Sequence, residues 1–269
     1  MKEILWLNKI NAPSVKSSFC AYLDILNYRH KMLIADIMED SNDFLRDLIE
    51  ISRKNVNTLN NQIQLKICND KVVLGIPDYN ELDTFNKHNI RRVFKDIARF
   101  QFQIVLSGYI IKGALSYGGL FINDSLIYGD ALFSSADLRN EAIYPRIILS
   151  EGMKNKVIRY LNAYDDGPDD FIPLRAYILR DDTGRFFINY LSSSLITSLD
   201  PPDYRDLHYH KTVIDILCRS LKNDGLYFEE LSWVKQYHNY FISFCCPCAY
   251  KSLLFEDVEE TNCENIDIL

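Results

Sequence analysis

Short apolar runs fill the first part of the chain. The spacing of their apolar positions changes between a strand-like and a helix-like repeat. Residues 18–25, SFCAYLDI, are apolar and aromatic with few polar members, which predicts a buried strand. Residues 26–30 predict a turn, and the roughly helical spacing of apolar positions after it predicts a helix over about 30–54. Within residues 62–76, apolar and polar positions alternate on either side of Asn69-Asp70, so this segment predicts a β-hairpin.

Helical and extended patterns continue to alternate up to residue 150. One side of residues 87–107 is apolar at helical spacing, and Gly108 is placed to end that helix. Residues 109–122 predict a strand, a glycine-rich kink and a second strand. A helix over about 130–143 and a strand over 146–150 complete the series. Strands and helices in this order predict an α/β or α+β sandwich with helices over one sheet. Of the two we expect α+β, with an antiparallel or mixed sheet flanked by helices.

The second part of the chain has a different pattern. An acidic loop at 165–170 precedes strand-like segments on both sides of a turn at 181–184. Two helical stretches, about 207–222 and 227–243, follow a Pro-Pro turn. We therefore predict three parts: an N-terminal segment (1–17), a domain that contains the sheet (18–195) and a helical C-terminal extension (196–269).

Composition narrows the class of protein. Of the 269 residues, 48% are hydrophobic and 25% charged, which is typical of a folded globular chain. The net charge of −7 argues against sequence-independent nucleic-acid binding, because that needs clustered lysine and arginine. The sequence shows no secretory signal and no apolar run long enough to predict a membrane span. We expect a cytoplasmic protein in which the seven cysteines are free thiols.

Two aspartates are candidate ligands for a metal ion. Asp24 lies near the end of the first predicted strand, and Asp70 lies in the turn of the predicted hairpin. If those strands are neighbours, the two carboxylates converge, and they repel each other unless a divalent cation lies between them. Two structural alternatives remain open at this point: Asp24 caps the following helix, or Asp70 is required by its turn.

Six segments, in order along the chain, resemble the motifs of one enzyme family. The segments are FCAYLDILNY, CNDKVVLG, IIKGALSYGGLF, GDALFSSADLRNEAIYPRIILS, LRDDTGRFFINYL and WVKQYHNYF. Together they are similar to class III nucleotidyl cyclases, and the last three resemble motifs of one branch, the pyrimidine cyclases of Pycsar anti-phage defence. The resemblance covers about residues 18–243.

This resemblance implies a class III cyclase-like fold and a homodimer with active sites at the subunit interface. It implies conversion of UTP or CTP, with UTP expected first, to the 3′,5′-cyclic monophosphate and pyrophosphate. It also implies two Mn²⁺ or Mg²⁺ ions per site, held by Asp24, Asp70 and the backbone carbonyl of Ile25. The product of such an enzyme is a second messenger, which we expect a separate effector to sense.

Further residues are expected to contact the substrate. The turn Leu26-Asn27-Tyr28 enters a helix, so its backbone N–H groups are candidates to bind phosphate oxygens. Lys71 and Arg146 are further candidates for the triphosphate, with a solvated lysine and a structural ion pair as their alternatives. Lys112 replaces the usual arginine of the family motif and is a candidate catalytic residue, because lysine also neutralises phosphate.

Several positions depart from the family pattern. Asn27 replaces the usual glycine, and asparagine tolerates a left-handed backbone. Phe133 and Asp137 stand where animal-type relatives have a catalytic asparagine and arginine. These departures support an alternative, a catalytically silent relative that binds a nucleotide or a partner. A weaker alternative is a zinc-dependent module built on His238 and the cysteines at 245–248.

Overall fold

The computed structural model describes most of the chain. The described residues are 14–31, 50, 63–78, 87–123, 125–163, 173–195, 204–221, 227–245, 251–256 and 267–268. Most of the helix predicted over 30–54 lies outside these residues, as do the acidic loop at 165–170 and Cys246 and Cys248. None of the helices within the described ranges is long and apolar enough to cross a membrane.

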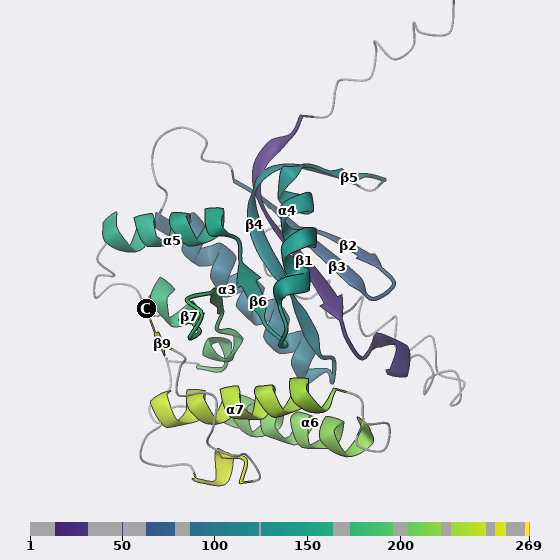
Figure 1. Ribbon diagram of the computed structural model, residues 1–269, viewed down its shortest axis with the longest axis vertical. Coiled ribbons are helices and arrows are strands. Elements are labelled where there is room, and N and C mark those ends of the chain that lie inside the picture. The colour runs from purple at the N-terminus through teal and green to yellow at the C-terminus, as the bar shows by residue number, and fades with distance from the viewer. Residues whose placement is uncertain are drawn as a thin grey trace, which may run out of the picture.

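Within the described residues, nine strands form one sheet (Figure 1). Its order is β2-β3-β1-β4-β6-β8-β7-β9, and the short β5 pairs with β4. β1 pairs antiparallel with β3 and β4, whereas β4 and β6 are parallel, so the predicted mixed sheet is confirmed. The strands are β1 (Lys16–Ile25), β2 (Gln64–Cys68), β3 (Lys71–Pro77), β4 (Ile111–Ile122), β5 (Ile127–Tyr128), β6 (Ile147–Leu149), β7 (Ile178–Arg180), β8 (Phe186–Ile188) and β9 (Asp267–Ile268).

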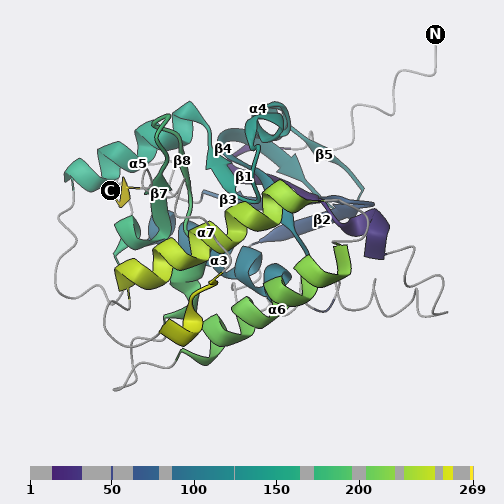
Figure 2. The ribbon, with the colours of Figure 1, turned by 60° about the horizontal axis from the view of Figure 1, so that its bottom comes forward.

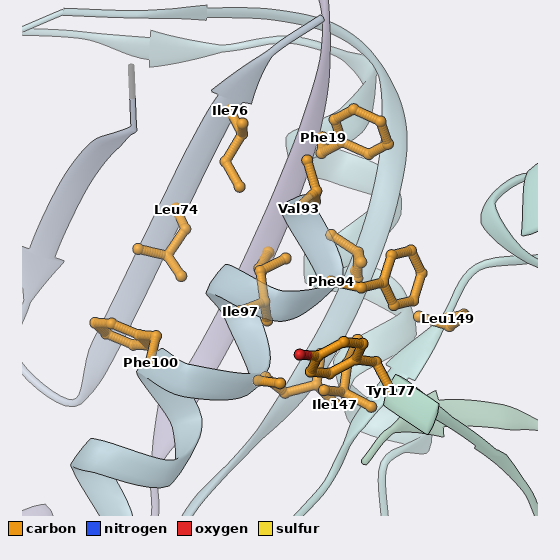
Figure 3. Close-up of a cluster of buried hydrophobic side chains, with 14 of the residues drawn as sticks. Phe19, Leu74, Ile76, Val93, Phe94, Ile97, Phe100, Ile147, Leu149 and Tyr177 are labelled. Atoms are coloured by element: carbon orange, nitrogen blue, oxygen red, sulfur yellow. The ribbon is translucent and has the colours of Figure 1, made fainter. Parts of the chain in front are cut away.

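Helices lie on both faces of this sheet, as predicted (Figure 1). The side chains of β1 alternate: Phe19 and Leu23 join the core beneath α3, and Cys20 packs toward α4 on the other face. Figure 3 shows Phe94 and Ile97 of α3 against the strands. The helices are α3 (Lys87–Leu106), α4 (Asp130–Leu138), α5 (Glu151–Ala163), α6 (Arg205–Leu221) and α7 (Phe228–Cys245).

α6 and α7 pack together and share a second core cluster with the sheet (Figure 2). That cluster joins Ile148 of β6 and Phe187 of β8 to Trp233 and Tyr237 of α7. The rings of Trp233 and Tyr237 are stacked, with centroids 5.3 Å apart. The two predicted C-terminal helices are thus present, and they bury apolar side chains against β6 and β8.

Several local predictions hold because short-range chemistry decides them. Gly108 has φ 79° directly after α3, a conformation that glycine adopts without strain, so the helix ends where predicted. Asn69 has φ 53° in the β2–β3 turn, and asparagine is one of the residues that tolerate this geometry. The predicted hairpin is present as β2 and β3, and the turn predicted over 26–30 is present at 26–27, with helical residues from Tyr28 on.

Other elements differ from the sequence prediction. The predicted glycine-rich kink is wrong: β4 runs unbroken through Gly118 and Gly119, which pair in regular register with Ser18 and Ser17. A side chain at Gly119 would approach Val15 to 2.8 Å, so these glycines allow close packing rather than a bend.

Helix boundaries also differ in the region after β4. The helix predicted to about 143 ends at Leu138 and continues as a 3₁₀ turn over Arg139–Glu141. Residues Leu174–Tyr177, predicted as strand, form another 3₁₀ turn. α5 was not predicted, although Met153, Val157 and Tyr160 are buried at helical spacing.

Candidate active site

The register of β1 and β3 brings Asp24 and Asp70 together. Asp24 lies opposite Lys71 in this antiparallel pair. The backbone N–H of Ile25 also donates to the carbonyl oxygen of Asp70, at 2.7 Å. The end of β1 and the hairpin turn are therefore fixed to each other by the backbone, and the predicted convergence of the two strands is present.

Both carboxylates contact a single cation, the ammonium group of Lys71. Its Nζ lies 3.1 Å from Oδ1 of Asp24 and 2.9 Å from Oδ2 of Asp70. Burial alone would lower the pKa of Lys71, but the interactions with Asp70 and Asp24 outweigh it and raise the pKa. Lys71 thus stays charged between the two aspartates, in the position that a shared divalent ion would take.

Arg139 is a further cation at this site, and no pattern in the sequence predicted it. Its Nε lies 3.5 Å from Oδ1 of Asp24, and its guanidinium group lies 4.8 Å from the ring centroid of Tyr22. Nε and Nη1 of Arg139 are buried and make no hydrogen bond to any described residue. Buried donors of this kind are unfavourable unless an acceptor reaches them. In the pairing of β1 with β4, Lys112 lies opposite Asp24, so residues with cationic side chains flank Asp24 on both neighbouring strands.

The turn after β1 is held by hydrogen bonds to the residues that follow α3. Leu26 N–H donates to the carbonyl of Ile110 at 2.8 Å, so this amide is engaged within the protein and is not open to a phosphate. The side-chain amide of Asn27 donates to the carbonyl of Gly108 and accepts from Ile110 N–H, both at 2.9 Å. Asn27 is buried and has no positive φ, so it stabilises the turn through its side chain rather than by left-handed geometry. Phosphate binding by the backbone of Asn27 and Tyr28 stays a prediction.

Arg146 forms a buried ion pair at the start of β6. Its Nη2 donates to Oδ2 of Asp181 at 2.7 Å, and its guanidinium lies 5.0 Å from the ring centroid of Phe187. Burial lowers the pKa of Arg146, although Asp181 acts in the opposite direction. Arg146 also lines a pocket of about 720 Å³ between the β7–β8 turn and α7. These contacts are the ones expected of Arg146 in a structural ion pair. Binding of the triphosphate by Arg146 stays a prediction.

The oxygen donors at this site fit a hard divalent ion. Two carboxylates and the carbonyl of Ile25 are the donor types that Mg²⁺ and Mn²⁺ prefer. Oδ1 of Asp24 is buried, and its contacts with Lys71 and Arg139 are ion pairs that a divalent ion would have to replace. No group of three or more His, Cys, Asp or Glu side chains with metal-binding geometry occurs in the part of the chain that the structure describes. Water and substrate oxygens would supply the other ligands, as is usual for Mg²⁺.

Two of the positions that depart from the family pattern are on the surface of α4. Phe133 is 58% exposed and Asp137 is also exposed. Arg139, by contrast, lies in contact with Asp24 just after this helix. A basic group is therefore present near the aspartates, two positions beyond the place where the motif comparison expects it.

His238, the histidine of the zinc alternative, is paired with a second buried histidine, His210 of α6. Nδ1 of His210 and Nδ1 of His238 are 3.0 Å apart, and both rings are fully buried. The other nitrogen of His210 contacts the hydroxyl of Tyr190, and that of His238 contacts the carbonyl of Leu253. Burial lowers the pKa of both imidazoles, to about 4 for His238. All four ring nitrogens have partners, so the described part of this cluster is a buried hydrogen-bonded network.

Comparison with known proteins gives similarity to solved structures only. No protein-family model matches the chain, and no curated protein matches it. Among solved structures, it is similar to a class III adenylyl cyclase-like ATP-binding protein from Pseudomonas aeruginosa, with 15% identity and a TM-score of 0.42. That match covers 53% of this chain and 35% of the other, so the chain spans about a third of that protein.

Two further solved structures are matched over most of their own length. An adenylyl cyclase of P. aeruginosa is 14% identical, with 65% of this chain and 94% of that chain covered and a TM-score of 0.42. A monomeric guanylyl cyclase domain from the aquatic fungus Blastocladiella emersonii is 10% identical, with 65% and 95% covered and a TM-score of 0.41.

Proposed function

We propose that this chain is a nucleotidyl cyclase that converts a pyrimidine nucleoside triphosphate, UTP ahead of CTP, to its 3′,5′-cyclic monophosphate and pyrophosphate. One observation carries the proposal: the carboxylates of Asp24 and Asp70, from two neighbouring strands, converge on a single cation. The ordered family-like motifs of the sequence, which lead to the pyrimidine branch, support it.

The residues at the end of β1 have distinct roles in this proposal. Asp24, Asp70 and the Ile25 carbonyl hold the divalent ions, which would activate the ribose 3′-hydroxyl and neutralise the triphosphate. Lys71 leaves its place between the carboxylates when ions bind and turns to a phosphate oxygen, as a flexible lysine side chain can. Lys112 and Arg139 lie beside Asp24 and neutralise the charge that develops on the phosphates.

The proposal extends to the assembly and its biological setting. We infer a homodimer with its active sites at the subunit interface, a cyclase domain over 18–195 and an extension over 196–269. Its cyclic nucleotide product would act as a second messenger in defence against phage and would be sensed by a separate effector. Such an enzyme would work in the cytoplasm with Mn²⁺ or Mg²⁺.

The test is a product assay with the full chain. The purified protein is incubated with each of the four nucleoside triphosphates in Mn²⁺ or Mg²⁺, and the products are resolved by mass spectrometry. A cyclic monophosphate from UTP is expected, with less or none from the purines. A folded protein that forms no cyclic product from any of the four would overturn the proposal, and product from a purine alone would overturn the pyrimidine assignment.

A second candidate is a catalytically silent relative that binds a nucleotide. It is favoured by the same ion pairs, because Lys71 and Arg139 already neutralise Asp24 without any metal. Nucleotide binding by calorimetry without turnover would support this candidate, whereas turnover would exclude it.

A further inference from the structure

Tyr227 connects the start of α7 to the turn that follows β1. Its hydroxyl donates a hydrogen bond to the backbone carbonyl of Leu26, 201 positions earlier in the chain. Leu26 comes directly after Ile25, whose carbonyl is a proposed metal ligand, and directly before Asn27. One side chain of the C-terminal helical part therefore contacts the peptide between the proposed metal ligands and the proposed phosphate turn.

The backbone of Tyr227 is in an unfavourable conformation. Its φ is 60°, and of the other described residues that are not glycine only Asn69 has a positive φ. Asparagine tolerates this region, but a bulky aromatic residue does so at a cost. The carbonyl of Tyr227 accepts from Leu231 N–H at 2.9 Å, which begins α7. This conformation places the ring at the beginning of the helix with its hydroxyl toward Leu26, and the contact it makes there offers a physical reason for keeping it.

The peptide at Leu26 is fixed on both sides. Its N–H donates to the carbonyl of Ile110, and its carbonyl accepts from Tyr227. Asn27 next to it is anchored through its side chain to Gly108 and Ile110. With these bonds made, the peptide planes around Ile25 and Asn27 have little freedom to turn. Burial raises the pKa of Tyr227, so its hydroxyl keeps its proton and remains a donor at neutral pH.

We propose that Tyr227 is a positioning residue for the active site: it holds the Leu26 carbonyl so that the Ile25 carbonyl and the backbone of Asn27 and Tyr28 keep their orientation toward metal and triphosphate. The role in turnover rests on the proposed cyclase function, whereas the ordering of the turn does not. Through this contact the helical C-terminal part becomes a component of the active site without touching the substrate.

The test compares Tyr227→Phe with Tyr209→Phe. The first variant keeps the ring and removes only the hydroxyl, and the second removes the hydroxyl of an exposed tyrosine on α6 as a matched control. In Tyr227→Phe the Mn²⁺ concentration for half-maximal activity should rise by about five-fold, and kcat should fall by about five-fold. This is the factor in an equilibrium constant that corresponds to the loss of one neutral hydrogen bond. The KM for nucleotide at saturating metal should change less. Amide hydrogen exchange over residues 24–31 should become faster, and Tyr209→Phe should match the wild type in every measurement.

Each outcome decides one part of the proposal. Equal metal dependence and equal exchange in wild type and Tyr227→Phe would overturn the positioning role. The same loss in both variants would also overturn it, because the effect would then be general destabilisation. If the wild type forms no cyclic product, the cyclase function fails on its own. In that case faster exchange over 24–31 in Tyr227→Phe alone would still establish that this contact orders the turn.

Discussion

At the scale of single residues, the site is decided by which charges surround Asp24. Lys71 and Arg139 lie within ion-pair distance of the same carboxylate oxygen of Asp24, whose side chain is 14% exposed. Partial burial strengthens these interactions relative to those of surface pairs. The chemistry of the site therefore depends on whether divalent ions and phosphates can displace or recruit these cations.

Replacing either aspartate by asparagine should stop turnover while leaving the fold intact. Asp24→Asn or Asp70→Asn keeps the shape and removes a ligand charge, so activity should fall by at least about 100-fold, because metal ions supply several kcal/mol of charge stabilisation. The midpoint of thermal unfolding should move by only a few degrees. Mass spectrometry of the products measures activity, and calorimetry measures the midpoint of thermal unfolding. Asp182→Asn, an exposed position in the β7–β8 turn, is the control, and full activity in both site variants would refute the metal assignment.

Removing the ammonium group of Lys71 should tighten metal binding. In Lys71→Met the two carboxylates lose the cation between them, so their repulsion favours a divalent ion, and the Kd for Mn²⁺ without nucleotide should fall several-fold. Isothermal calorimetry measures this change directly. Lys154→Met, which removes a lysine that pairs with Glu151 on α5, should leave the Kd unchanged. Unchanged or weaker binding in Lys71→Met would contradict the shared position of lysine and metal.

At the scale of elements, the sequence predicts strands and turns that neighbouring residues determine. It does not predict contacts between residues that are far apart along the chain. The strand ending at Asp24 and the hairpin turn at Asp70 follow from local pattern and turn chemistry, so the main carboxylate pair was predictable. Arg139 and Tyr227 were not, because their partners Asp24 and Leu26 lie in β1 and in the turn after it, far away in sequence. The prediction of a kink at Gly118 and Gly119 was wrong for the same reason: pairing with β1 keeps β4 continuous through both glycines.

The buried imidazoles that join α6 to α7 should make the stability of the fold depend on pH. The pKa of His238 is lowered to about 4, so the folded state stays neutral while the unfolded chain takes up a proton below about 6.5. The contribution of His238 to the free energy of unfolding is thus complete above pH 6.5 and is lost as the pH falls toward 4. Between pH 6.5 and 5 the loss should be about 2 kcal/mol for this histidine.

Urea unfolding of the wild type and of His238→Phe at several pH values tests this dependence. Asp96, whose pKa burial raises to about 6, acts in the opposite direction in the same range. Its effect cancels in the difference between the two proteins, which leaves the contribution of His238 together with its effect on His210. The free energy of unfolding of His238→Phe should decline less between pH 6.5 and 5. Parallel curves for the two proteins would show that His238 does not titrate as its buried position requires.

At the scale of the whole molecule, an exposed apolar cluster is the candidate interface for the homodimer that we propose. Leu126, Tyr128 and Phe133, from β5 and α4, are 51%, 56% and 58% exposed. The rings of Tyr128 and Phe133 are in edge contact, with centroids 6.3 Å apart. Adjacent exposed aromatic side chains are typical of interaction surfaces. Tyr128 pairs with Phe121 of β4, whereas Asp24 pairs with Lys112 of the same strand, so the cluster lies toward the end of β4 away from Asp24.

A charged substitution in this cluster should therefore separate the proposed dimer. Phe133→Glu places a carboxylate in the interface, and sedimentation should show a monomer where the wild type is a dimer, with loss of activity. Phe244→Glu changes an equally exposed phenylalanine, at 59%, near the end of α7 and should leave the dimer intact. A wild type that is monomeric at assay concentration, or a Phe133→Glu variant that stays dimeric, would remove this face from the model of the assembly.

The hydrogen bond from Tyr227 to Leu26 also has a consequence for biosynthesis. The two residues are 201 positions apart, and a chain emerging from the ribosome makes its N-terminal contacts first. A nascent chain can pair β1 with β3 and β4 and bring Asp24 and Asp70 together, but the turn at Leu26 gains its last restraint only when α7 has been synthesised. Ordering of the site is thus delayed until nearly the whole chain exists, and truncated translation products carry the aspartates without the finished turn.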